Sequence, residues 1–339
     1  SARPAPHLHQ MMPLWMMPLA IATGNTFVLK PSSRVPLTAL RLLELCVSAG
    51  VPPGVVNSTF GEKAEVEQLC AHRDIKAVSF VGGNAAGESI YKLCAEHNTR
   101  AQCNTAAKNH VVIMPDASKE EALDALIGGA FAQCGQRCMS VPVAIFVGGA
   151  QEWIRDLIPR CDAIHVGQGN EAGVTLGPLV TPQAKANIVR LVREGVDDGA
   201  TLLVDGLDFK HSDSQYSDGN FLGPTVMDGV TPSMECYTEE LFGPVLQVLR
   251  AESYSDALAL VNASRYGNGS AIFTASGATA RAFTRDVEAG MVGVNVPVPV
   301  PLPQFSFTGW KDSMLGDLHM FGKDGVRFYT KQRTITSRW

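Results

Sequence analysis

The segment AVSFVGGNAAGESIYKLCAE, residues 77–96, contains a candidate strand, a glycine turn and a candidate helix in direct succession. Ala77–Val81 is rich in β-branched and aromatic residues, which favours a strand. Gly82 and Gly83 then interrupt the apolar run, and from Ala85 to Glu96 apolar residues recur at helical spacing. A strand, a tight turn and a helix form half of a βαβ unit, so this segment predicts an α/β fold.

The same alternation continues on both sides of this segment. Upstream we expect strands and helices at Thr26–Leu29, Leu37–Ala49 (closed by Gly50), Val55–Phe60 and Ala64–Ala71. Downstream we expect a strand at His110–Met114, a helix at Glu120–Gln133 and a strand at Val141–Val147. This spacing predicts a parallel, doubly wound sheet followed by a second α/β layer. Val294–Pro303, with proline at alternate positions, predicts an extended connection at a domain surface.

Composition excludes several classes of protein. The chain has 339 residues, of which 45% are hydrophobic and 18% charged, which is typical of a globular protein with a large core. The formal net charge is −5 and no basic run occurs, which argues against nucleic acid or an anionic membrane as partner. The longest apolar stretch, Met11–Ala22, contains Pro13 and Pro18 and falls short of the ~20 residues that span a bilayer.

The cysteines point to chemistry rather than to metal binding. Eight are present, without a CxxC pair or a CxxxH cluster, so we expect no metal site. In FAQCGQRCMS, residues 131–140, a predicted helix ends near Gly135, and Arg137 and Cys138 follow. A thiol at such a break, near backbone N–H groups and a cation, can be held as a thiolate and attack a carbonyl. Taken alone, this evidence is weak and favours a packing role for Cys138, because most cysteines are packing residues.

The order of several motifs resembles the aldehyde dehydrogenase superfamily over essentially the whole chain. The segments that carry the resemblance are GNTFVLKPSSRVP (residues 24–36), SFVGGNAAG (79–87), FAQCGQRCM (131–139), EELFGPVL (239–246) and GVNVPVPVPLPQFSFTG (293–309). The resemblance implies NAD as cofactor and Cys138 as the nucleophile. It implies cofactor contacts at Lys30, Ser33 and Arg34 on the adenosine side, Gly82 and Gly83 at the pyrophosphate, and Glu240 and Phe242 on the nicotinamide side. Alternative interpretations make Lys30 a solvated turn residue, Gly82 and Gly83 an ordinary turn, Glu240 a local cap and Phe242 a core residue.

Finer detail resembles the methylmalonate-semialdehyde branch of that superfamily. The segments concerned are AAKNHVVIMPDA, GQRCM, TPQAK, YGNGSAIFT, VNVPVPVPLP and FYTKQRTITSRW. Asn104 occupies the position where most relatives have a Glu that activates water. An amide is too weakly basic for that role, whereas a second thiol can resolve a thioester, so Asn104 favours acyl transfer to coenzyme A. The branch further implies that Arg137 holds a substrate carboxylate; the alternative is a salt bridge at a helix end.

The resemblance also implies the organisation of the chain and its setting. We expect a partial, Rossmann-type NAD-binding domain over residues 1–105, a catalytic thiol domain over 106–310 and a C-terminal return over 311–339. Within that return, the β-prone tail 326–339 would form an oligomerisation strand. A small semialdehyde substrate, a homo-oligomer or a larger complex, and the mitochondrial matrix are expected on the same basis.

Some positions depart from the family pattern. The resemblance begins at Met12, and an asparagine that would help to stabilise the oxyanion is expected near His7, where the sequence does not match. Ser33 replaces an expected Glu, and Gly83 replaces an expected Ser. A second hypothesis is therefore a catalytically degenerate paralogue that serves as a structural subunit of a larger assembly. A third, an ordinary hydrolytic aldehyde dehydrogenase, is disfavoured by Asn104.

Overall fold

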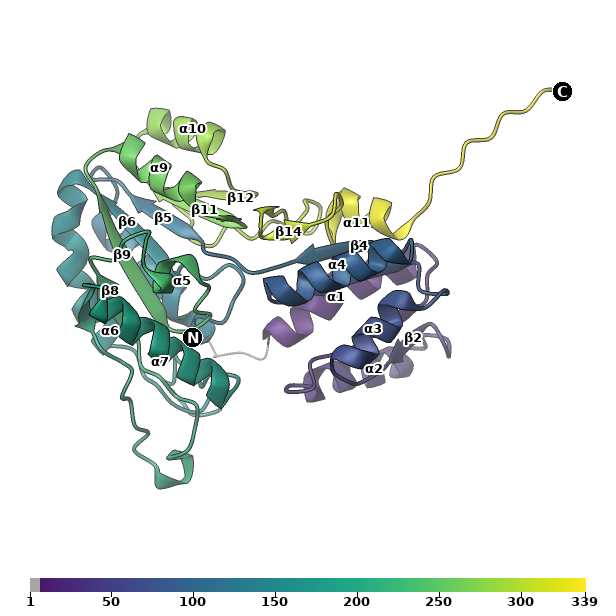
Figure 1. Ribbon diagram of the computed structural model, residues 1–339, viewed down its shortest axis with the longest axis horizontal. Coiled ribbons are helices and arrows are strands. Elements are labelled where there is room, and N and C mark those ends of the chain that lie inside the picture. Colours follow the sequence, from purple (N-terminus) through teal and green to yellow (C-terminus); the bar gives the residue numbers. More distant parts are fainter. Residues whose placement is uncertain (1–6) are drawn as a thin grey trace. The chain divides into compact units, whose positions relative to one another are not determined.

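The computed structural model describes residues 7–339, with side chains from residue 11 onward (Figure 1). Its contacts divide the chain into two compact units. The larger unit contains residues 106–300 and 309–313, and the smaller unit contains residues 7–105, 301–308 and 314–339. None of the described helices is both long and apolar enough to cross a membrane.

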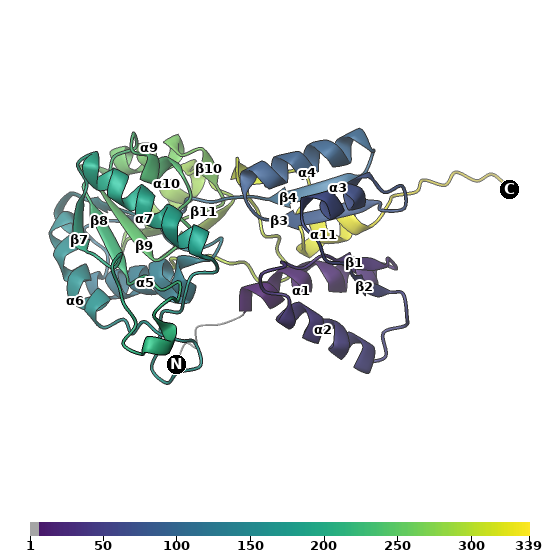
Figure 2. The same ribbon diagram turned by 60° about the horizontal axis from the view of Figure 1, so that its bottom comes forward.

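A seven-stranded sheet forms the centre of the larger unit, in the order β12-β11-β5-β6-β9-β8-β7; Figure 1 labels β5, β6 and β12, and Figure 2 labels β7. Its strands are β5 (His110–Ile113), β6 (Val143–Val147), β7 (Thr201–Val204), β8 (Thr225–Asp228), β9 (Val245–Ala251), β11 (Gly269–Phe273) and β12 (Met291–Val294). All neighbouring pairs are parallel except β7 with β8. Every residue of β5 and β6 is buried, as expected for central strands covered on both faces. The predicted strands at 110–114 and 141–147 are confirmed.

Helices pack along this sheet. They are α5 (Lys119–Phe131), α6 (Leu157–Asp162), α7 (Pro182–Asp197), α8 (Glu235–Thr238), α9 (Tyr254–Ala263) and α10 (Gly277–Asp286), with 3₁₀ turns η1 (Ala132–Gly135), η2 (Gly148–Asp156) and η3 (Ser214–Tyr216). Local sequence sets where the helices begin: Thr181 accepts the Ala184 N–H ahead of α7, with Pro182 at the first helical position. The short strands β10 (Tyr266–Gly267) and β13 (Trp310–Lys311) form a separate antiparallel pair.

The smaller unit holds two separate ladders. In one, β1 (Phe27–Leu29) is parallel to β2 (Val56–Ser58). In the other, β3 (Ala77–Val81) is parallel to β4 (Arg100–Asn104), and β14 (Met314–Leu315) is antiparallel to β4. The expected strands are present, but the single doubly wound sheet predicted for this region is wrong in detail, because no strand of the described residues bridges β1 and β3.

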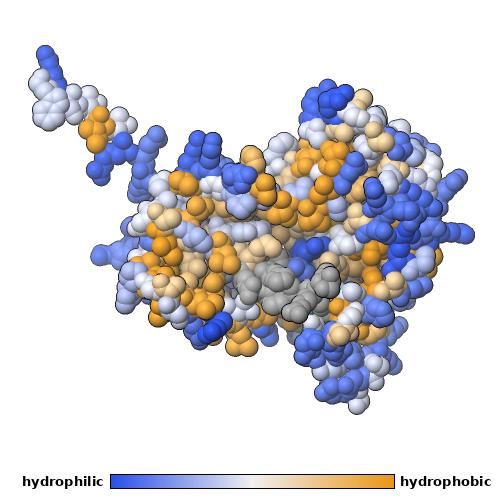
Figure 3. Space-filling view, turned by 180° about the vertical axis from the view of Figure 1, so that it is seen from behind, coloured by the Kyte–Doolittle hydropathy of each residue, from blue (hydrophilic) through white to orange (hydrophobic). Residues whose placement is uncertain are grey.

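The helices of the smaller unit are α1 (His7–Ala22), α2 (Leu37–Ser48), α3 (Lys63–Ala71), α4 (Asn84–Glu96) and α11 (Gly322–Tyr329). Of these, α2, α3 and α4 follow the prediction closely, whereas α1 and α11 were not predicted. Gly50, with φ +87°, ends the α2 region in the left-handed conformation that glycine tolerates best. Apolar side chains remain on the surface of α2, where Leu37, Leu45 and Val47 are exposed, and Figure 3 shows such apolar areas interspersed with polar ones.

The C-terminal tail differs from expectation. Its first residues, up to Tyr329, lie in α11, where Gly325 and Phe328, three positions apart, are buried on one helical face. Residues 330–339 form no strand within this chain. The strand prediction is wrong for residues 326–329, because burial of one helical face outweighs local strand propensity there. For residues 330–339, an oligomerisation strand that pairs with another subunit stays a prediction. Within the predicted proline-rich connection Val294–Pro303, Val294 is the last residue of β12, and residues 295–303 carry neither helix nor strand, as predicted.

Candidate functional site

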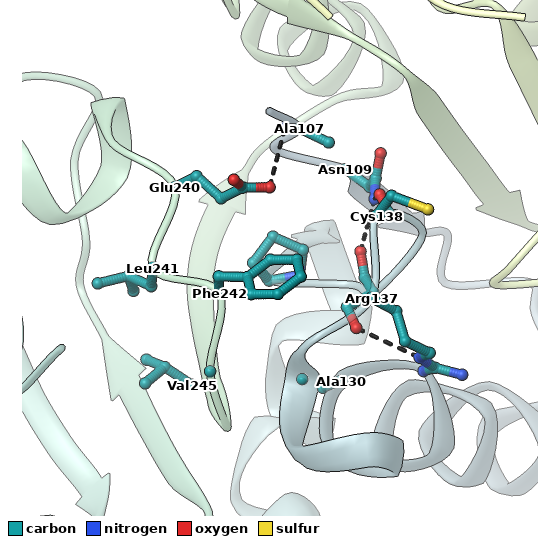
Figure 4. Close-up of a pocket in the computed structure, with 13 residues that line it drawn as sticks. Ala107, Asn109, Ala130, Arg137, Cys138, Glu240, Leu241, Phe242 and Val245 are labelled. Atoms are coloured by element: carbon teal, nitrogen blue, oxygen red, sulfur yellow. Dashed lines mark hydrogen bonds between the residues drawn. The ribbon is translucent and has the colours of Figure 1, made fainter. Parts of the chain in front are cut away.

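Four chain segments meet at one edge of the seven-stranded sheet. His110 of β5 is in register with Val143 of β6 and Ser270 of β11, and Val143 is also in register with Gln247 of β9. Because these strands are parallel, the segments that lead into them meet at their amino ends, whereas ligands of open α/β sheets usually bind at the carboxyl ends. The pocket there has about 310 Å³ of empty space including its opening, and its lining comprises Ala107, Asn109, Ala130, Gly135, Arg137, Cys138, Ser140, Pro142, Glu240, Leu241, Phe242, Gly243 and Val245 (Figure 4).

A sharp turn presents Cys138 to this pocket. After α5 the chain takes positive φ angles at Gln133 (55°), Cys134 (57°) and Gly135 (65°). Left-handed backbone is uncommon for residues other than glycine and concentrates at functional sites. The predicted helix break at Gly135 is confirmed, and it leaves Cys138 half-buried while Cys134 is fully buried.

Opposing influences act on the Cys138 thiol. Burial raises its pKa, and the charge of Glu240 raises it further. The backbone N–H groups of Met139 and Cys138 lower it, as does the Arg137 cation, but the net result is a pKa of about 11. The backbone N–H groups and the cation expected from the sequence do favour the thiolate, but the effect of burial on the pKa is larger. The thiol is therefore protonated at neutral pH, and its proton must leave before it attacks a carbonyl.

Arg137 is bonded to the end of the preceding helix. Its Nη2 donates to the carbonyl oxygens of Gly128 (3.0 Å) and Gly129 (2.7 Å), and its Nε donates to Ser140 Oγ at 3.3 Å. Figure 4 shows its side chain directed away from Glu240. These bonds lie at a helix end, as the alternative expected, but they are not the salt bridge that it named, because the acceptors are two carbonyl oxygens and a hydroxyl. The two carbonyl oxygens also accept the N–H groups of Ala132 and Val141. Because Arg137 also lines the pocket, its contact with a substrate carboxylate stays a prediction.

The structure places Glu240 and Phe242 in the same pocket as Cys138. Glu240 Oε1 accepts the Ala107 N–H at 2.9 Å, and burial raises the pKa of this carboxyl to about 7. Phe242 adopts a positive φ of 49° and is 42% exposed, so it is not a core residue. Two residues predicted for the nicotinamide side and two predicted for catalysis thus share one pocket of the larger unit.

The other predicted cofactor residues belong to the smaller unit. Lys30 Nζ donates to the carbonyl oxygens of Pro31 (3.0 Å) and Gly61 (3.2 Å), and Ser33 Oγ donates to Gly61 O at 3.4 Å. The backbone N–H of Arg34 donates to Ser32 Oγ at 3.3 Å. Lys30, Ser33 and Arg34 follow the carboxyl end of β1, and Gly61 follows that of the parallel strand β2. This is the edge where open α/β sheets bind ligands.

Gly82, Gly83 and Asn104 lie close together at the carboxyl ends of β3 and β4. The Gly82 N–H donates to the Asn104 carbonyl oxygen at 3.1 Å. Gly83 precedes the first turn of α4, and a Cβ placed on it would meet nothing within 4 Å, so the expected serine would fit. The side chain of Asn104 is 5% exposed, and neither its Nδ2 nor its Oδ1 has a hydrogen-bond partner among the described residues.

With this geometry established, a comparison of the chain with family models is decisive. A model described as the aldehyde dehydrogenase family matches residues 9–335. The chain belongs to the aldehyde dehydrogenase family.

Relatives within the aldehyde dehydrogenase family agree in sequence and in structure. The chain is 50% identical over 97% of its length to the acylating, mitochondrial methylmalonate-semialdehyde/malonate-semialdehyde dehydrogenase of Bos taurus, of which it covers 61%. It is 50% identical over the same share to the acylating, mitochondrial methylmalonate-semialdehyde dehydrogenase of Arabidopsis thaliana, of which it covers 54%. The chain thus spans between half and two thirds of the length of these relatives.

Solved structures of aldehyde dehydrogenases confirm the fold. The methylmalonate-semialdehyde dehydrogenase of Oceanimonas doudoroffii matches with a TM-score of 0.95 at 44% identity, over 97% of this chain and 67% of that one. A betaine aldehyde dehydrogenase of Staphylococcus aureus in complex with NAD+ matches with a TM-score of 0.86 at 31% identity, over 93% of this chain and 62% of that one. The position near His7 where this family pattern has an asparagine lies outside the residues whose side chains are described.

Some polar residues of this aldehyde dehydrogenase site were missed by sequence reasoning. Lys108 is buried, and its Nζ donates to the carbonyl oxygens of Cys236 (2.7 Å) and Glu239 (2.6 Å). Burial lowers its pKa to about 8. Asn109 and Asn268 are buried against the Cys138 segment. These residues lie in the motifs AAKNH and YGNGS, where the only local signal is a polar residue within an apolar segment. That signal does not indicate which group the polar residue bonds to.

Glu240 makes the stability of the chain depend on pH. Its pKa is raised from 4.5 to about 7 in the folded chain, so folding favours the neutral carboxyl. The contribution of the neutral carboxyl to the free energy of unfolding is fully present below about pH 4.5 and is lost as pH rises through about 7. Glu240→Gln stays neutral at every pH. We expect its melting temperature to equal that of the parent chain near pH 4.5 and to exceed it at pH 8, measured by thermal unfolding. A difference that does not change with pH would contradict the burial of this carboxyl.

Proposed function

We propose that the chain supports NAD-dependent, coenzyme A-acylating oxidation of a small carboxylated semialdehyde, of the methylmalonate or malonate semialdehyde type, with Cys138 as nucleophile. The observation that carries the proposal is a half-buried thiol shortly after a left-handed turn, in one pocket with Glu240 and Phe242. The names of the relatives supply the class of substrate and the acylating outcome.

The residues present fit NAD in each unit taken separately. In the smaller unit, Lys30 and Ser33 are gathered around the Gly61 carbonyl, with Arg34 adjacent, at the sheet edge suited to a ribose. Gly82 and Gly83 precede the first turn of α4, and the N-terminus of a helix suits a pyrophosphate. In the larger unit, Glu240 and Phe242 would hold the nicotinamide side. When bound, NAD supplies a hydride acceptor.

The chemistry of Cys138 follows from its surroundings. Its sulfur would add to the aldehyde carbon and later carry the acyl group as a thioester. The N–H groups of Met139 and Cys138 favour negative charge at this point, because both stabilise the thiolate. Arg137 would attract a substrate carboxylate to the same pocket.

Asn104 supports resolution of the thioester by a thiol rather than by water. Its amide cannot take a proton from water at neutral pH, whereas the thiol of coenzyme A is partly ionised there. Both polar atoms of the buried side chain lack a partner among the described residues. An unmade hydrogen bond of this kind costs about 1–3 kcal/mol, so a ligand that contacts the amide would offset that cost.

We infer the mitochondrial matrix as the location, since the curated relatives above are named mitochondrial, and a homo-oligomer or larger complex as the assembly. The hypothesis of a degenerate structural subunit finds no support in these relatives, which are named as enzymes.

Asn104→Glu tests the acylating function. The parent chain should form NADH and acyl-coenzyme A from malonate semialdehyde only when NAD and coenzyme A are both present. A carboxylate at position 104 restores a base for water, so the variant should form free acid and raise the ratio of free acid to acyl-coenzyme A by about 10²-fold. Asn104→Gln, which adds no base, is the matched control. Equal product ratios in Asn104→Glu and the parent chain would contradict the role of Asn104, and absence of NADH from the parent chain would contradict the function.

A further inference from the structure

Two buried asparagine amides converge on the backbone of the nucleophile. Asn109, 4% exposed, donates through Nδ2 to the carbonyl oxygens of Cys138 (2.8 Å) and Ser140 (2.7 Å). Asn268, 5% exposed, donates through Nδ2 to the same Cys138 oxygen at 2.9 Å. Figure 4 shows Asn109 directly beside Cys138, with the bond drawn. One carbonyl therefore receives donors from two segments that are 159 positions apart in sequence.

The two asparagines are themselves held by the sheet. Asn109 Oδ1 accepts the Gly269 N–H at 3.0 Å, and Asn109 and Gly269 precede residues paired between β5 and β11. Asn268 Nδ2 also lies 2.9 Å from Met139 Sδ. A Cβ on Gly269 would come within 2.7 Å of Met139 Cε, so the Met139 side chain is tightly packed there. Both amides thus have fixed positions, because rigid strands set them.

The consequence for the nucleophile follows from the geometry of the peptide bond. The carbonyl of Cys138 and the N–H of Met139 belong to one planar peptide group and point in opposite directions. Donors that hold the carbonyl oxygen therefore also set the direction of the Met139 N–H. That N–H stabilises the Cys138 thiolate against the unfavourable effect of burial.

We infer that Asn109 and Asn268 are positioning residues, which fix the Cys138–Met139 peptide so that the Met139 N–H faces the nucleophilic sulfur. This inference deepens the proposed function and rests on Cys138 as the nucleophile. Neither amide takes part in the reaction; each acts through the backbone of Cys138. Loss of either should leave the thiol in place but make it harder to ionise.

The test is the rate of Cys138 alkylation by iodoacetamide between about pH 7 and pH 9.5, followed by peptide mass spectrometry without NAD or aldehyde. Below the pKa of a thiol the rate follows its thiolate fraction. For Asn268→Ala and Asn109→Ala we expect alkylation of Cys138 to be about tenfold slower at every pH, the size of one lost hydrogen bond to a charged group. Cys46, which is partly exposed in the smaller unit, is the internal reference and should not change.

Asn262→Ala is the matched control. Asn262 also bridges two backbone groups of the larger unit, donating to Asp286 O (2.9 Å) and accepting from the Glu288 N–H (2.8 Å). It should lower stability without changing Cys138 alkylation. If Asn268→Ala unfolds, as labelling of the buried Cys134 would report, Asn268→Ser takes its place because its hydroxyl leaves a smaller cavity.

The inference would be overturned if the folded Asn109→Ala and Asn268→Ala variants alkylated Cys138 at a rate within twofold of the parent chain, whatever their turnover. An equal slowing in Asn262→Ala would overturn it as well, because the effect would then reflect general loosening. A shifted alkylation profile in a chain that forms no NADH would sustain the inference and overturn the proposed function instead, so the two failures are distinguishable.

Discussion

Cys138→Ser will form NADH from semialdehyde roughly 10⁴-fold more slowly than the parent chain, or more slowly still. A serine hydroxyl nearly matches the thiol in shape, but it ionises at far higher pH and cannot form a thioester. In a site where burial already raises the pKa of the thiol to about 11, the hydroxyl would be inert. The measurement is NADH absorbance with saturating semialdehyde, NAD and coenzyme A.

Cys134→Ala is the matched control for that experiment. Cys134 lies on the same turn but is 1% exposed, and burial raises its pKa to about 12. Its replacement should leave turnover within a few-fold of the parent chain once stability is taken into account. A Cys138→Ser variant that keeps more than a tenth of the turnover would show that another residue is the nucleophile.

The second large effect concerns stability. A Cβ on Gly135 would lie 2.0 Å from Gly243 O and 3.1 Å from Ala130 O, and the residue has a φ of +65°. Gly135→Ala must therefore displace backbone, not only a flexible side chain. Overpacking and a left-handed alanine together should cost about 3 kcal/mol, or roughly 6–12 °C in melting temperature.

Gly128→Ala provides the comparison for this substitution. Gly128 lies within α5, and a Cβ there meets nothing within 4 Å, so alanine should be neutral or slightly stabilising through its higher helix propensity. The measurement is thermal unfolding by circular dichroism at one pH. Equal melting temperatures for the two variants would mean that the Cys138 turn and the Gly243 segment are not in close contact.

Local structure was largely predictable. The strand at Ala77–Val81 matches β3 residue for residue, and the helix expected at 85–96 begins one residue earlier, at Asn84. The bounds of these elements follow from apolar periodicity and flanking glycines, which are properties of residues close together in the sequence. They can therefore be found from one sequence alone. The same reasoning failed for the tail at 326–329, where packing of Phe328 decides the conformation.

Site residues also divide into those found from local motifs and those found only from the fold. Cys138, Glu240 and Phe242 were predicted from motif order, and the structure brings them to one pocket. The contacts of Lys108 and Asn268 were not predictable, because each bond spans more than a hundred positions and depends on strand register. The net rise in the pKa of Cys138 also needed the fold, since burial is a property of the whole unit.

The two short ladders of the smaller unit have a practical consequence. Within the described residues, β1 pairs only with β2 and β3 only with β4, and every residue of β3 is partly exposed. An unpaired strand edge offers N–H and C=O groups to any extended peptide, and α2 adds exposed apolar side chains. Each of these edges is therefore a place where a strand of another chain could add to the ladder through backbone hydrogen bonds.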